Sequence, residues 1–271
     1  MPKIQFFNKV DIMHTVSRSF QDLQTLKHCG VIDIISTMYL PIQVKQPGTA
    51  RDLFDWLLDA EIKRGAMAGV NIHPALGIHP MMVPSDTKVL DGALQYLESA
   101  LKTKKAIAVG ETGLHHGTPE EFISFKRHLE LAHQYNLPAI IHTPREQKAE
   151  LTKVIMKELR KHKVERALID HATKENIAII LQDPRRNVKI GVSISKSNLS
   201  KKDAILLYKN YSYENRYILN SNAGSGPGDM LSVIKSIEEF EKAGFRSRIL
   251  QKLCYDNALD IFGGILRESS L

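Results

Sequence analysis

The fold is decided by residues 106–142, which read AIAVGETGLHHGTPEEFISFKRHLELAHQYNLPAIIH. Residues 106–109 and 139–142 are short, apolar, β-rich runs of the kind that form buried strands. Between them, residues 119–135 carry apolar side chains at helical spacing. A strand, a helix and a second strand in this order predict a parallel β–α–β unit with a right-handed crossover.

The same alternation continues along the whole chain. We expect further strands near residues 6–13, 31–38, 69–78, 167–170, 188–192 and 217–220. The helical patterns lie near residues 17–29, 49–65, 88–102, 145–161, 173–182, 200–209 and 229–243. Eight strand–helix units in this length predict a (β/α)8 TIM barrel, and residues 247–262 predict one or two extra C-terminal helices. Because no linker rich in Pro, Gly and Ser interrupts the pattern, we expect residues 1–271 to form a single domain.

Composition excludes several classes of protein. Of 271 residues, 43% are hydrophobic and 25% charged, which argues against intrinsic disorder. The most apolar window, residues 31–44, is too short for a membrane span and contains Asp33 and Pro41. The N-terminal segment lacks the apolar core of a signal peptide, and Cys29 and Cys254 are too few for a disulfide framework or a thiolate zinc site. We therefore expect a cytoplasmic protein that has no membrane partner.

The charge balance is mildly basic. Lys and Arg number 37 against 30 Asp and Glu, a formal net charge of +7. The basic clusters fall near predicted helix ends and turns, where cations complement the helix dipole. A basic surface also tolerates polyanions, so a barrel that binds nucleic acid through its charge is one hypothesis to keep.

Residues with metal-binding side chains stand at the ends of the predicted strands. The first strand ends at His14, the fourth at Glu111, the fifth at His142, and the sixth is followed by His171. Because the carboxyl ends of barrel strands meet at one mouth, these four side chains should converge. Three imidazoles and a carboxylate suit a divalent ion, which we expect to be Zn, Mn or Mg.

The motifs around these residues resemble the TatD-related metal-dependent hydrolases, barrel enzymes of the amidohydrolase superfamily. The resemblance rests on segments such as VGETGL (109–114), IIHTPR (140–145), IDH (169–171) and LNSNAGSGP (219–227). It runs from about Ile4 to Gly263 and implies two metal ions. They would be held by a His-x-His pair after the first strand, a bridging Glu, two later His residues and an Asp after the eighth strand. On this pattern Glu111 is the bridging carboxylate, and His14, His142 and His171 are metal ligands.

Two positions depart from the family pattern. The same-side partner of His14 on the first strand is Ile12, which cannot bind a metal. Asn222 stands where the family has its catalytic Asp, and an amide cannot accept a proton as a base. We therefore expect one bound ion rather than two, and a catalytic centre of Glu111 and Asn222 that is partly degraded.

Neighbouring residues have more than one interpretation. Arg145 and Lys148 could face the mouth and bind substrate phosphate, or they could belong to a solvated helix face. His79 could bind substrate or only form the turn before Pro80. His115 and His116 are expected to be loop residues, and Trp56 to be a core residue.

Two functional hypotheses follow. The first is a TatD-like hydrolase that acts on phosphodiester or nucleic-acid-type substrates, or on a phosphorylated small molecule. The alternative, suggested by Ile12 and Asn222, is a catalytically impaired relative that serves as a binding or scaffolding protein. The sequence leaves the oligomeric state open.

Overall fold

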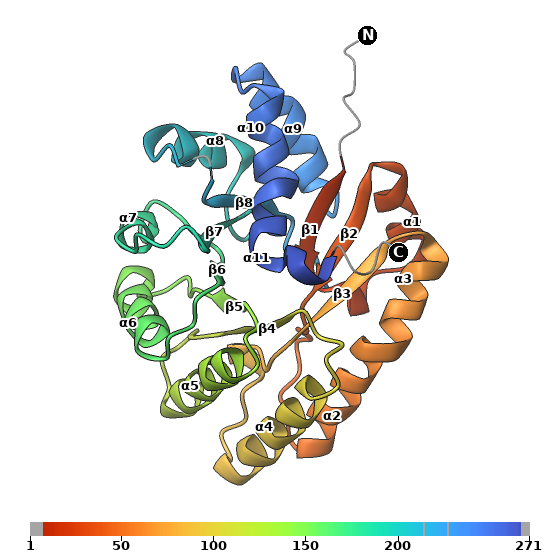
Figure 1. Ribbon diagram of the computed structural model, residues 1–271, viewed down its shortest axis with the longest axis vertical. Coiled ribbons are helices and arrows are strands. Elements are labelled where there is room, and N and C mark those ends of the chain that lie inside the picture. The colour runs from red at the N-terminus through yellow and green to blue at the C-terminus, as the bar shows by residue number, and fades with distance from the viewer. Residues whose placement is uncertain (1–7, 214, 227, 267–271) are drawn as a thin grey trace.

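A parallel barrel forms the body of the protein. The computed structural model describes residues 8–213, 215–226 and 228–266. Within these ranges, eight parallel strands follow one another in chain order from β1 to β8 and alternate with helices. The strands surround a common axis with helices on the outside (Figure 1), so the predicted (β/α)8 TIM barrel is confirmed.

The bounds of the elements agree closely with the sequence pattern. The strands are β1 (Lys9–Met13), β2 (Val31–Ser36), β3 (Asn71–Leu76), β4 (Ala108–Gly113), β5 (Ala139–His142), β6 (Ala167–Ile169), β7 (Val188–Ser193) and β8 (Tyr217–Asn220). The helices are α1 (Phe20–His28), α2 (Pro47–Asp55), α3 (Ile62–Ala68), α4 (Thr87–Leu101), α5 (Pro119–Gln134), α6 (Lys148–Lys161), α7 (Ile177–Leu181), α8 (Lys201–Asn210), α9 (Ser232–Lys242), α10 (Ser247–Gln251) and α11 (Asn257–Leu266). None of the helices among these residues is long and apolar enough to cross a membrane.

Some predicted bounds differ from the structure. The strand predicted over residues 106–109 begins at Ala108 and continues to Gly113, so Glu111 lies inside β4. The helix predicted over residues 49–65 is divided into α2, a wide π-helical turn at Trp56–Glu61, and α3. The helix predicted over residues 173–182 is shorter in the structure, where α7 covers only Ile177–Leu181. Phe6 and Phe7, at the start of the first predicted strand, lie outside the described residues.

Trp56 corrects one prediction about the core. The side chain is 52% exposed, and its Nε1–H donates to Glu61 Oε2 at 3.2 Å. Trp56 stands at the start of the π-helical turn, where each turn contains more residues than in an α-helix. The wider turn shifts the phase of the helix, so the 3.6-residue period assigns Trp56 to the wrong face.

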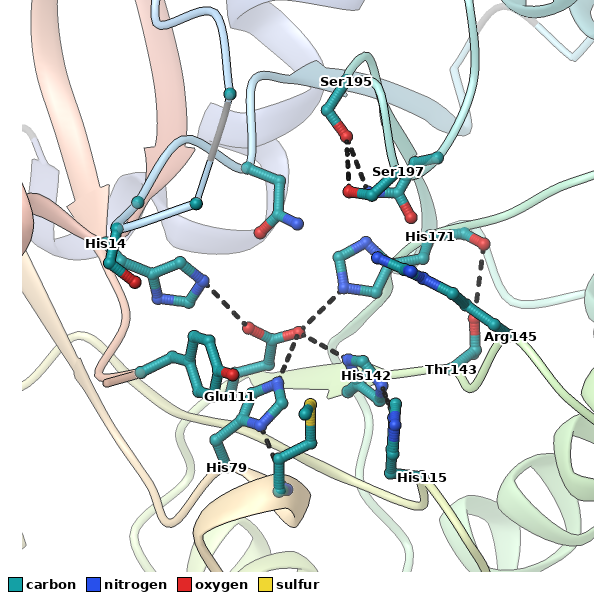
Figure 2. A pocket seen from close by; sticks show the side chains of 18 of the residues that line it. His14, His79, Glu111, His115, His142, Thr143, Arg145, His171, Ser195 and Ser197 are labelled. Carbon is teal, nitrogen blue, oxygen red and sulfur yellow. Dashed lines mark hydrogen bonds and ion pairs between the residues drawn. The ribbon is translucent and has the colours of Figure 1, made fainter. Parts of the chain in front are cut away.

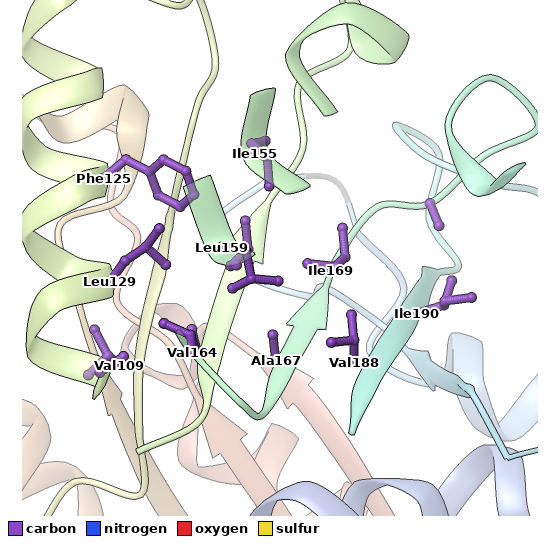
Figure 3. Close-up of a cluster of buried hydrophobic side chains, with 14 of the residues drawn as sticks. Val109, Phe125, Leu129, Ile155, Leu159, Val164, Ala167, Ile169, Val188 and Ile190 are labelled. Carbon is purple, nitrogen blue, oxygen red and sulfur yellow. The ribbon is translucent and has the colours of Figure 1, made fainter. Parts of the chain in front are cut away.

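The apolar core has two layers. Figure 3 shows the outer layer, in which side chains of β4, β6 and β7 pack against α5 and α6. The inner layer fills the barrel, and alternate residues point into it, as Ile140 does while Ile141 points outward. Ala258, Ile261 and Phe262 of the C-terminal helices join the inner layer. The extra C-terminal helix α11 therefore closes one end of the barrel and leaves the carboxyl ends of the strands for a site.

The seam between β1 and β8 is closed partly by a side chain. The backbone N–H of His14 donates to Ala223 O at 2.8 Å, and that of Asn222 donates to Ile12 O at 3.2 Å. Between them, Asp11 Oδ1 accepts the N–H of Ser221 at 2.7 Å and that of Ile12 at 2.8 Å. Asp11 therefore satisfies backbone donors that the seam leaves unpaired. Burial raises the pKa of this carboxyl to about 7, against the lowering effect of its hydrogen bonds to Ser221.

Candidate metal centre

A pocket of about 450 Å³ lies at the carboxyl ends of the strands. Every strand, or the loop that follows it, contributes a lining residue: His14, Tyr39, His79, Glu111, His142, His171, Ser195 and Asn222 from β1 to β8 in order. Figure 2 shows His14, His79, His142 and His171 pointing from different sides of the pocket towards Glu111. This is the position at which TIM barrels carry their functional sites.

Glu111 lies at the centre of the pocket and is almost fully buried. Its Oε2 is 3.7 Å from His14 Nε2. Its Oε1 is 3.1 Å from His171 Nε2, 3.2 Å from His142 Nδ1 and 3.9 Å from His79 Nε2. Burial opposes ionisation of this carboxyl, but the surrounding imidazoles outweigh burial and hold the pKa of Glu111 well below its usual range. The site therefore contains a buried carboxylate surrounded by four imidazoles.

The tautomer of His14 is fixed by the hydrogen bonds of its outer nitrogen, the ring nitrogen that faces away from Glu111. His14 Nδ1 is 3.2 Å from Thr37 O and 2.9 Å from Thr37 Oγ1. A backbone carbonyl can only accept, so Nδ1 carries the proton and donates it to Thr37. The lone pair of His14 is then on Nε2, the atom that faces Glu111. This is the arrangement of a metal-binding imidazole, whose other nitrogen donates to a carbonyl.

A second chain of hydrogen bonds fixes His171. Ser193 Oγ donates to Asp170 Oδ1 at 2.9 Å, and His171 Nδ1 lies 2.8 Å from the same hydroxyl. Because Ser193 has given its only proton to Asp170, it accepts one from His171 Nδ1. In the neutral ring the lone pair of His171 Nε2 therefore faces Glu111 Oε1, and in the protonated ring Nε2–H donates to that oxygen. Burial alone would lower the pKa of His171, but Asp170 and Glu111 outweigh burial and raise it.

His142 is paired with a second histidine. Its Nδ1 faces Glu111, and its Nε2 lies 3.1 Å from His115 Nδ1. Burial lowers the pKa of His142 to about 4 in spite of its hydrogen bond to Glu111, so the ring is neutral near pH 7. The neutral ring has two tautomers: in one, Nδ1–H donates to Glu111, and in the other, Nε2–H donates to His115 and the Nδ1 lone pair faces the carboxylate, as a metal ligand requires.

These residues fit a divalent cation. When both rings are neutral, the lone pairs of His14 Nε2 and His171 Nε2 point at carboxylate oxygens, so each of these contacts brings two acceptors together. A cation placed among them would relieve this repulsion. Nitrogen and oxygen donors together suit Zn or Mn, and a carboxylate centre also accepts Mg.

The other sequence-predicted residues are distributed over the pocket and its wall. Asn222 and the exposed Arg145 line the pocket, and neither side chain has a hydrogen bond or ion pair with a residue in the described ranges. Ile12 is buried in the inner core layer, as expected for the same face of β1 as His14. Pro227, in the motif after β8, lies outside the described residues.

Lys148 does not face the mouth, contrary to one of its two interpretations from sequence. It is buried, and its Nζ donates to His171 O at 2.9 Å and to Thr143 Oγ1 at 3.1 Å. The physical reason is that α6 begins only at Lys148, after a left-handed residue at Gln147, so the side chain points under the site. Burial lowers the pKa of Lys148 to about 8. Its role in the structure is to hold the main chain of His171, which has a φ of 60°.

Several residues of the site were not identified from sequence. Ser193 ends β7, so the strand-end argument that found His142 could have found it. Glu121 accepts the backbone N–H groups of His115, His116 and Gly117 and so shapes the loop after β4. Nothing in the helical pattern of α5 marks Glu121, because its partners belong to a loop whose path the sequence does not define.

Comparison with known proteins gives consistent matches. Residues 13–212 match the model of the family described as TatD related DNase. An uncharacterized metal-dependent hydrolase of Methanocaldococcus jannaschii is 34% identical over 248 residues, which cover 90% of this chain and 95% of the relative. A TatD-like protein from Archaeoglobus fulgidus has a solved structure with a TM-score of 0.76 and 30% identity, covering 94% of this chain and 99% of that one. The phosphotriesterase homology protein of Escherichia coli, solved with phosphate in its active site, shares the fold with a TM-score of 0.70 at 15% identity, over 96% of this chain and 100% of that chain.

Proposed function

Because this chain belongs to the TatD-related family of metal-dependent hydrolases, we propose that it hydrolyses phosphodiester bonds in nucleic-acid-type substrates with the help of one divalent ion. The observation that carries the proposal is the arrangement around Glu111. In their neutral tautomers, His14 and His171 turn lone pairs towards a buried carboxylate, and a divalent cation among these atoms would stabilise that arrangement.

The ion would be held on the Oε1 side of Glu111. His142 and His171 lie 3.2 Å and 3.1 Å from that oxygen, and together with Glu111 they make three protein ligands. Three protein ligands leave a coordination position open, as catalytic metal sites require. When bound, a divalent ion polarises a phosphoryl oxygen and lowers the pKa of a water molecule.

The Oε2 side of Glu111 is poorer in ligands. His14 is the imidazole that faces this oxygen, its partner on β1 is the apolar Ile12, and the nearby Asn222 brings no charge. The proposed stoichiometry of one ion rests on this asymmetry.

The rim of the pocket supplies groups for an anionic substrate. Arg145 from the loop after β5 and Lys196 from the loop after β7 both line the pocket and are exposed. Two cations at one mouth favour phosphate, and a pocket of about 450 Å³ has room for a small ligand or one end of a chain. Asn222 can accept a hydrogen bond from an attacking water but cannot take its proton. We therefore expect slow turnover, reduced about 10²–10⁴-fold by the missing base.

Metal content and hydrolysis test the proposal together. The purified protein is dialysed against Zn²⁺, Mn²⁺ or Mg²⁺, its bound metal is counted by mass spectrometry, and bis(p-nitrophenyl) phosphate, single-stranded DNA and RNA are offered as substrates. We expect one ion per chain and slow hydrolysis, both lost in Glu111→Gln. Absence of bound metal, or activity that is unchanged in Glu111→Gln, would contradict the proposal. Lys235→Gln, which removes a surface ion pair with Asp229, serves as the control.

A binding or scaffolding role is the second candidate, and Asn222 is the observation that favours it. In that case the wild-type protein binds metal but turns over no substrate, and Asn222→Asp creates hydrolysis by supplying the base. Robust turnover by the wild-type protein would exclude this alternative.

A further inference from the structure

His79 differs from the other imidazoles of the pocket in the hydrogen bond made by its outer nitrogen. The backbone N–H of Met81 donates to His79 Nδ1 at 3.2 Å, and the ring thereby caps the 3₁₀ turn Pro80–Met82. A backbone amide can only donate, so Nδ1 of His79 carries a lone pair. The ring proton is then on Nε2, the atom that lines the pocket 3.9 Å from Glu111 Oε1.

This tautomer is opposite to those of His14 and His171. Their outer nitrogens donate, so their inner nitrogens present lone pairs, as metal ligands must. The inner nitrogen of His79 presents a proton instead. By distance alone, His79, Glu111 and His142 could surround an ion, but a protonated Nε2 has no electron pair to give it.

The surrounding structure holds His79 in place. Gly77 packs so closely on Gly110 that a Cβ at position 77 would lie 2.8 Å from the Gly110 backbone, and this contact brings the turn against β4. The backbone N–H of Ile78 donates to His128 Nε2 at 2.9 Å, which fixes the turn from α5. The ring of Tyr39 also packs against the ring of His79, with 4.5 Å between the two ring centroids. Figure 2 shows His79 pointing into the pocket towards Glu111.

We propose that His79 is a neutral imidazole that donates its Nε2–H to an oxygen of the phosphoryl group being hydrolysed, and that it is not a metal ligand. The inference rests on the proposed function, because it assigns the donor that meets the substrate at that site. A fixed, buried donor next to the reacting group needs no reorganisation when negative charge develops on a phosphoryl oxygen. A neutral donor also leaves the positive charge of the site to the ion, so His79 does not compete with the ion for Glu111.

The tautomer can be read directly by NMR. In protein labelled with ¹⁵N-histidine, long-range ¹H–¹⁵N correlations distinguish a protonated Nε2 from a protonated Nδ1, and the His79 signals are assigned by their absence in His79→Asn. We expect a protonated Nε2 in both the metal-free and the ¹¹³Cd-loaded protein. We also expect ¹¹³Cd–¹⁵N coupling at His142 and His171 and none at His79. A proton on Nδ1 of His79, or coupling of its ring to cadmium, would overturn the proposal.

A variant then tests the contact with phosphate. Asn is a favourable cap, so His79→Asn keeps an acceptor for Met81 N–H while its shorter amide does not reach the position of Nε2. We expect unchanged metal content and binding of inorganic phosphate, measured by calorimetry on the metal-loaded protein, that is about 10- to 100-fold weaker. For bis(p-nitrophenyl) phosphate, kcat/KM should fall about 10²–10³-fold in His79→Asn. His79→Gln should regain part of this activity, because its longer side-chain amide carries a donor. His133→Asn, at an exposed position on α5, is the matched control.

The outcomes separate this inference from the proposed function. Unchanged phosphate affinity in His79→Asn, or loss of the metal ion in that variant, contradicts the donor role. A wild-type protein that binds no divalent ion contradicts the proposed function instead, and the NMR spectrum of the metal-free protein still decides which nitrogen of His79 carries the proton.

Discussion

Replacing Ser193 by alanine tests whether the outer hydrogen bonds prepare the metal ligands. Ser193 is fully buried and links His171 Nδ1 to Asp170 Oδ1 with distances of 2.8 and 2.9 Å. Asp170 Oδ1 keeps its other donors, the N–H of His171 and Asn220 Nδ2. The main loss in Ser193→Ala is therefore the acceptor of the His171 Nδ1–H.

The magnitude follows from this loss. A buried donor left without a partner costs about 1–3 kcal/mol, so the free energy of unfolding of the metal-free protein should fall by that amount. His171 can regain a partner by moving its proton to Nε2, where Glu111 Oε1 accepts it at 3.1 Å. That tautomer no longer offers a lone pair to a metal. Removing such a supporting group weakens metal affinity about 10- to 100-fold, which corresponds to about 1.4–2.7 kcal/mol.

The assay is competition for Zn²⁺ with a chromophoric chelator, together with urea unfolding of the metal-free protein. Ser236→Ala is the control, because Ser236 is equally buried and its hydroxyl donates to Ser232 O within its own helix. It should lose stability without losing zinc affinity. If Ser193→Ala binds zinc as tightly as the wild type, the reasoning about tautomers at this site is refuted.

Three further predictions concern the fold and the rim. Burial raises the pKa of Asp11 from 3.8 to about 7. Between about pH 4 and pH 7 the folded protein therefore holds a proton that the unfolded chain has lost. Its free energy of unfolding falls by up to about 4 kcal/mol as the pH rises through this range. Asp11→Asn should remove that part of the pH dependence in urea titrations at pH 4 to 8, and an unaltered slope would contradict it. Arg145→Met should raise KM for a phosphodiester about tenfold. Lys148→Met should leave KM unchanged and lower the free energy of unfolding by about 1–3 kcal/mol, because Lys148 bonds the main chain of His171. A raised KM in Lys148→Met and an unchanged KM in Arg145→Met would instead identify Lys148 as the phosphate ligand. Gly77→Ala should lower stability by about 1–3 kcal/mol, since its Cβ would meet backbone at 2.8 Å. Gly226→Ala should have the same Tm as the wild type, because its Cβ would lie more than 4 Å from the described residues other than its chain neighbours.

The departures from the sequence prediction share a physical cause. Trp56 was placed by helical periodicity, which assumes 3.6 residues per turn, and Lys148 by its position shortly after His142, which assumes that the next helix opens towards the mouth. A π-helical turn at Trp56 and a left-handed residue before Lys148 break these assumptions. Neither feature has a signal in composition, because both depend on how the helix is fitted against the barrel.

Periodicity and strand-end residues were sufficient to predict the barrel and the convergence of His14, Glu111, His142 and His171, because parallel strands in a closed sheet all end at one mouth. The sequence could not say which nitrogen of each imidazole faces that mouth. That was decided by the outer partner of each ring, namely Thr37 for His14, Ser193 for His171 and the Met81 amide for His79. A histidine is the same residue in the sequence whether it gives or takes a hydrogen bond, and only the neighbours that folding brings to its outer nitrogen determine whether it offers the pocket a lone pair or a proton.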